Sequence, residues 1–163
     1  MISRRALVGT GLTAATAAVV VVTARVGGVL DDVLRGLGSE PHPEPDQGDV
    51  RRLRRASTAQ AALIASIDAT IDRHGRLAGD LQPLRVVADE QLVAVGGRVT
   101  STEAPDVPPG RRAATAELSL LAAASAEARE DDAVSAASPD VARVLASMSA
   151  GLSQLAAGIA EAS

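Results

Sequence analysis

Few side chains in this 163-residue sequence are of the kinds that carry out catalysis or hold metal ions. It contains no cysteine, which excludes disulfides, thiolate metal sites and a catalytic thiol. Of the two histidines, His42 lies between prolines in a polar stretch, and His74 lies at the predicted end of a helix. Neither has a neighbouring group that would orient it for proton transfer or metal binding.

The carboxylates also lack the arrangement that acid–base chemistry needs. The pairs Asp89-Glu90 and Asp131-Asp132 are adjacent in the sequence, and adjacent residues of a helix point about 100° apart. Such pairs are poor general acid–base partners, because the two groups cannot converge on one substrate. The sequence therefore predicts no catalytic residues and no bound cofactor.

The overall composition narrows the possible partners. The net charge is −4, which argues against nucleic acid, because affinity for nucleic acid depends on neutralising phosphates. There is no Phe, Tyr or Trp, so bases would find no stacking platform. The core must be built from Leu, Val, Ile and Ala, and the many alanines predict helices that approach closely.

Apolar residues recur at steps of three and four in four segments, and no segment alternates over the length of a strand. The clearest segment runs from Ser138 to Ser163, where Ser138 suits the N-cap and Pro139 the first turn. The other predicted helices span about Asp49–His74, Gly79–Val95 and Arg111–Ala137. Their connections predict an all-α fold, an antiparallel up-down four-helix bundle over residues 49–163.

Several local expectations follow from the same periodicity. Asp49 is expected to cap the first of these helices, and Gly75 to end it in the left-handed conformation. Leu121 is expected to face inward. The charged residues that follow it are expected to face water as a mostly acidic patch, comprising Glu127, Arg129, Glu130, Asp131 and Asp132.

The N-terminal residues have the pattern of a targeting segment. Arg4 and Arg5 precede an uncharged apolar stretch over residues 6–24 that ends in small residues, which is typical of a secretory signal peptide. Two arginines after a serine also resemble the twin-arginine export signal. Two further alternatives are an uncleaved anchor, since about 20 apolar residues span a bilayer, and a cytosolic helix. A signal peptide and an uncleaved anchor would both place the C-terminal part of the chain outside the cytoplasmic membrane, in the envelope or secreted.

The chain therefore divides into three parts. Residues 1–24 form the signal peptide or membrane anchor, and residues 25–48 form a juxtamembrane segment and a linker rich in proline. Residues 49–163 form the bundle. Membrane contact is expected through residues 6–24 if the signal is not cleaved.

The layout of residues 49–163 resembles the ferritin-like domain of exported proteins, often headed by twin arginines, from high-GC bacteria. The resemblance depends on the capped first helix, on Leu92-Val93-Ala94-Val95-Gly96-Gly97 at the end of the second, and on Ala146-Ser147-Met148-Ser149-Ala150 in the fourth. Ferritin-like bundles hold two metal ions with Glu and Glu-x-x-His ligands. The resemblance places those ligand positions near residues that cannot fill the role: Gln60, Ala88, Gln91, Ser125, Leu152 and Leu155.

Because metal ligands are missing, the polar residues among these positions have another possible role. Ser57, Gln60, Gln91 and Ser125 are expected to form a small buried hydrogen-bonded layer, since buried amides need partners. The alternative is that a modest rotation of the helices leaves Gln60 and Gln91 at the water edge.

The sequence thus predicts a non-enzymatic, extracytoplasmic helical bundle that serves as an interaction module for an unidentified protein partner. The alternative is a metal-binding or oxidative ferritin-like enzyme whose site uses surface carboxylates shared between chains, such as Glu127, Glu130, Asp131 and Asp132. A third hypothesis is a membrane-anchored module that forms a homo-oligomer through its alanine-rich faces.

Overall fold

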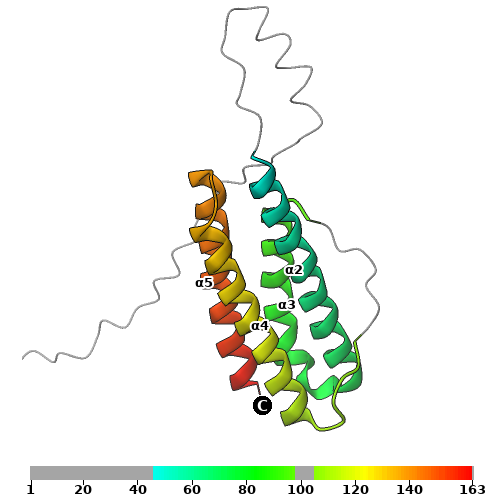
Figure 1. The fold of residues 1–163 in the computed structure, drawn as a ribbon. Coiled ribbons are helices and arrows are strands. Elements are labelled where there is room, and N and C mark those ends of the chain that lie inside the picture. Colours follow the sequence, from blue (N-terminus) through cyan, green and yellow to red (C-terminus); the bar gives the residue numbers. More distant parts are fainter. Residues whose placement is uncertain (1–45, 98–104, 163) are drawn as a thin grey trace, which may run out of the picture.

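The computed structural model describes residues 46–97 and 105–162, and within these ranges it contains helices and no strands (Figure 1). The elements are α2 (Gln47–Arg73), the short 3₁₀ helix η1 (Gly75–Leu77), α3 (Ala78–Ala94), α4 (Arg111–Val134) and α5 (Pro139–Glu161). The predicted all-α class is confirmed for this part of the chain. The predicted export segment, with Arg4 and Arg5, lies outside the described residues. Among the described helices, none has the length and apolar character that crossing a bilayer requires.

The cap of α2 differs from the prediction. The side chain of Asp46, and not that of Asp49, takes the N-cap position and accepts a hydrogen bond from the Asp49 N–H at 3.0 Å. Gly75 does not adopt the left-handed conformation either, because the chain continues directly into η1. The left-handed glycine is Gly96, with φ of 74°, where the end of α3 requires it.

The four long helices pack side by side around a core of leucine, isoleucine and alanine. The most extensive contact joins α4 and α5. Two serine hydroxyls cross this contact and donate to backbone carbonyls of the facing helix: Ser119 to Ala156 O and Ser149 to Ala126 O, both at 2.9 Å. Such bonds require backbones in close approach, which explains why small residues line both helices.

Glycine serves the same purpose between α5 and α3. A β-carbon at Gly151 would overlap the amide nitrogen of Gln91, and one at Gly158 would press against Leu84 at 3.2 Å. Both glycines therefore allow a longer side chain of α3 to lie against the backbone of α5.

The contacts also establish the directions of the helices. α2 and α3 are antiparallel, because Gln60 meets Gln91 whereas Asp68 meets Arg85. α4 and α5 are antiparallel by the two serine bonds described above. α3 ends beside Ser57, near the start of α2, where Gly97 lies against that serine.

The start of α4 lies at the opposite end of α2. The His74 Nε2–H donates to Pro108 O at 2.8 Å, just before α4 begins, and Arg55 pairs with Asp132 near the end of α4. α3 and α4 therefore run in the same direction, and residues 95–110 connect opposite ends of the bundle (Figure 1). This order, with one crossover, differs from the alternating order predicted from the connections.

The apolar stripe of α5 agrees closely with its inner face. Val141 at the start of the stripe is partly buried, and the other members are buried: Leu145, Met148, Leu152, Leu155 and Ile159. The prediction for α4 was wrong at three residues. Leu121 is 40% exposed, whereas Arg129 and Asp132 are buried, at 4% and 9% exposed. Alanines on every side of α4 explain the error, because they leave its apolar periodicity weak.

Candidate functional site

Two amides meet in the interior between α2 and α3. Gln60 is 1% exposed, and its Nε2 donates to Ala88 O at 2.8 Å and to Gln91 Oε1 at 3.1 Å. Its own Oε1 is buried and has no hydrogen-bond partner in the structure. A buried acceptor without a partner lowers stability, so this arrangement is only partly favourable.

The other members of the predicted polar layer lie elsewhere. Ser57 is half-buried beside Gly97, and Ser125 donates within its own helix, to Leu121 O at 2.8 Å. The structure thus brings together Gln60 and Gln91, and Ser125 does not join them. The remaining positions that the ferritin resemblance assigned to metal ligands are buried and apolar: Ala88, Leu152 and Leu155.

Gln60→Leu is expected to leave the stability unchanged or to raise it by up to about 1 kcal/mol. The substitution removes the unpartnered Oε1 from the core, while Gln91 is exposed enough to bond water instead. Chemical denaturation followed by far-UV circular dichroism measures the difference. A loss of more than about 1.5 kcal/mol would contradict this expectation and would show that Oε1 has a partner, such as a buried water.

Asp49 forms a contact that the periodicity did not predict. Its side chain is buried and accepts hydrogen bonds from the Ala137 N–H at 3.0 Å and the Ser138 N–H at 2.8 Å, in the turn before α5. Arg52 donates to the same carboxylate at 3.1 Å. The carboxylate thus satisfies backbone donors at the start of α5 and fixes α2 against the α4–α5 turn. No signal in the sequence separates this role from that of an ordinary helix cap.

A second buried carboxylate lies nearby. Asp132 accepts from Arg129 Nη2 at 2.9 Å within α4 and from Arg55 Nη2 at 2.6 Å across from α2. Arg129 is buried and its Nε has no partner in the structure, whereas the Arg55 side chain is 58% exposed. Asp132 is therefore occupied by two cations, which removes it from the carboxylates available to a metal.

The four arginines at the start of α2 do not act as one basic cluster. Arg52 pairs with Asp49, and Arg55 pairs with Asp132. Arg51 and Arg54 are exposed on the outer face of the helix. Two of the four positive charges are thus balanced by buried carboxylates, and the other two face outward.

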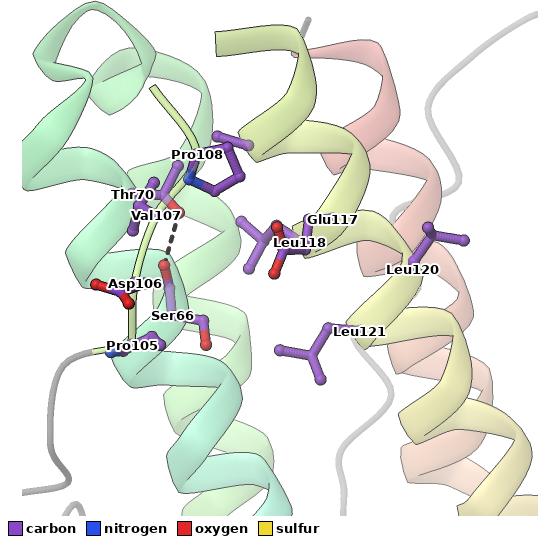
Figure 2. A pocket seen from close by; sticks show the side chains of 11 residues that line it. Ser66, Thr70, Pro105, Asp106, Val107, Pro108, Glu117, Leu118, Leu120 and Leu121 are labelled. Atoms are coloured by element: carbon purple, nitrogen blue, oxygen red, sulfur yellow. Dashed lines mark hydrogen bonds between the residues drawn. The ribbon is translucent and has the colours of Figure 1, made fainter. Parts of the chain in front are cut away.

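An open groove of about 350 Å³ lies between α2, the segment before α4, and α4 itself (Figure 2). Its lining includes Leu118 and Leu121 of α4 and two residues with carboxylates, Asp106 and Glu117. The two hydroxyls contributed by α2 are used within the helix, since Ser66 donates to Ala62 O and Thr70 donates to Ser66 O. No lining residue is a histidine or an arginine. The groove is thus a mainly apolar surface with two carboxylates in its lining, and it holds no nucleophile in contact with a base.

In the described residues, no three His, Asp or Glu side chains come together in a way that could hold a metal ion. No protein-family model matches the chain, and no curated protein or solved structure does. The function must therefore be inferred from the geometry of the chain itself.

Proposed function

We propose that this protein is a non-enzymatic, exported interaction module, built as a ferritin-like helical bundle whose metal site has been replaced. The observation that carries the proposal is the interior of the bundle. The positions that the ferritin resemblance assigns to metal ligands hold the Gln60–Gln91 amide pair and buried apolar residues, which are Ala88, Leu152 and Leu155. An interior of this kind offers a redox metal neither carboxylates nor imidazoles.

The order of the helices also supports the ferritin-like interpretation. Ferritin-like bundles differ from simple up-down bundles by one long crossover connection. Residues 95–110 join opposite ends of the bundle, which agrees with that layout. The role as an interaction module is supported by large apolar side chains on outer faces of the bundle, notably Leu120 at 71% exposed and Val93 at 59%.

Elemental metal analysis tests the non-enzymatic proposal. The chain is purified without a histidine tag and quantified by peptide-bond absorbance, because it has no aromatic residue. We expect less than stoichiometric iron, manganese and zinc. A stoichiometric metal that survives dialysis would overturn the proposal and bring forward the alternative of an oxidative enzyme with carboxylates shared between chains.

The proposed export has its own test. Replacing Arg4 and Arg5 with lysine is expected to retain the chain in the cytoplasm, because a twin-arginine route requires the arginine pair itself and not positive charge alone. Cell fractionation and immunoblotting measure the distribution. The matched control replaces the pair Arg54 and Arg55 with lysine, which should not alter export. Unchanged export of the Arg4 and Arg5 variant would reject the twin-arginine route.

A further inference from the structure

The outer face of α4 carries a stripe of small residues centred on one large apolar side chain. α4 contacts only α2 and α5 among the described elements, so one face of it is not covered by another helix (Figure 1). Leu120, 71% exposed, lies on that face and is also one of the residues that line the groove; Figure 2 shows its side chain directed away from that of Leu121. At about 100° per residue, the exposed residues Ala113, Ala116, Leu120, Ala124 and Glu127 fall within an arc of about 80°.

The charges at the two ends of this stripe have opposite signs, with Arg112 at its start and Glu127, Glu130 and Asp131 at its end. Arg112 directly precedes Ala113, and the side chains of Arg112, Glu127 and Glu130 are all exposed. Arg112 and Glu130 are 18 residues apart (130 − 112), which is about five helical turns, so they lie on the same flank of the stripe. None of the three takes part in an ion pair with the rest of the described chain.

This pattern is complementary to itself when the helix direction is reversed. A two-fold axis that relates two antiparallel helices places each flank against the same flank of the partner. With the axis at Leu120, Leu120 meets its own copy and Ala116 meets Ala124. Arg112 then lies opposite Ala128, between Glu127 and Glu130 of the other copy, once at each end of the interface. Glu117, also exposed, lies on the other flank, so the two-fold axis brings no cation opposite it. An isologous contact needs this kind of self-complementarity, and alanines allow helix axes to approach to about 8 Å.

We propose that the partner of this module is a second copy of the same chain, docked as an antiparallel α4–α4 dimer with its two-fold axis at Leu120. This inference rests on the proposed function as an interaction module, and it names the partner.

The dimer also bears on the alternative of a metal site shared between two chains. With the axis at Leu120, the Glu127 residues of the two copies are about 20 Å apart, given a rise of 1.5 Å per residue, so their carboxylates could not share an ion.

Disulfide crosslinking tests the dimer on the full-length chain in mild detergent. The chain has no cysteine, so single replacements report one position without background. Leu120→Cys should form a covalent dimer on mild oxidation, because the axis brings two copies of this position together. Ala113→Cys and Glu127→Cys should each fail alone and should crosslink when mixed. Val93→Cys, exposed on α3, is the control and should remain monomeric.

Charge exchange provides a second readout. Combining Arg112→Glu with Leu120→Cys should abolish the crosslink, and so should combining Glu127→Arg and Glu130→Arg with Leu120→Cys. Mixing the two charge variants should restore it. Leu120→Cys crosslinking no better than Val93→Cys would overturn the dimer, as would crosslinks insensitive to charge. Circular dichroism verifies that each variant is folded. Since the crosslink requires neither export nor the absence of metal, its failure is distinguishable from failure of the proposed function.

Discussion

Replacing Leu152 with Asp is expected to abolish the cooperative thermal transition of the bundle. Leu152 is fully buried, at 0% exposed, in the middle of the inner stripe of α5. Truncation of a buried leucine alone costs about 2–5 kcal/mol. The aspartate adds an unpaired charge with no cation to receive it, and the total is expected to exceed about 5 kcal/mol, which approaches the whole stability of a small domain.

Far-UV circular dichroism during heating measures this effect, and Leu120→Asp is the matched control. The control makes the same chemical change on the exposed face of α4. In chains dilute enough to be monomeric, its cost should stay near the helix propensity difference of about 0.5 kcal/mol. It should nevertheless lose the proposed dimer. A Leu152→Asp chain that melts like the unsubstituted one would show that the inner face of α5 is wrongly assigned.

The buried residues of α5 could be predicted from the sequence and those of α4 could not, and the difference has a physical reason. In α5, large apolar residues recur at steps of three and four on one side only, so the buried stripe could be predicted from Leu145 to Ile159. In α4, alanine lies on every side, and alanine is compatible with burial and exposure alike. The periodicity therefore could not show that Arg129 faces inward while Leu120 and Leu121 are exposed.

The direction of α4 and the role of Asp49 depend on contacts between distant parts of the chain. Nothing local to residues 95–110 specifies which end of the bundle they must reach, and the contact of His74 with Pro108 is visible only in the folded chain. In the same way, the backbone donors that Asp49 satisfies at Ala137 and Ser138 lie almost ninety positions away. Local capping rules place a carboxylate at the start of a helix but do not predict which donors it satisfies.

The amide pair in the interior was likewise only partly predictable from the sequence. The sequence left Gln60 either in a buried polar layer or at the water edge, and the structure shows that it is buried, at 1% exposed. Its pairing with Gln91 depends on how α3 sits against α2 and α5. Gly151 permits that position, because its missing side chain leaves room for the Gln91 amide. Complementary shape of this kind has no periodic signal in a single sequence.

The buried ion pairs of α4 lead to the second large prediction. Asp132→Asn is expected to lower the free energy of unfolding by about 3–5 kcal/mol, because it leaves the buried Arg129 guanidinium without its counter-charge. The amide is nearly the same size as the carboxylate, so the effect isolates charge from packing. Equilibrium denaturation compares it with Asp131→Asn, the exposed neighbour, which should change stability by less than about 0.5 kcal/mol.

Two further variants separate the contributions of the two arginines. Arg55→Met removes the exposed partner of Asp132 and should cost about 1 kcal/mol or less, since its side chain is 58% exposed. Combining Arg129→Met with Asp132→Leu removes both buried charges and should restore most of the stability that Asp132→Asn loses, because well-packed apolar residues often replace a buried ion pair without penalty. If the double variant is as unstable as Asp132→Asn, the loss comes from packing at this end of α4 and not from an uncompensated charge.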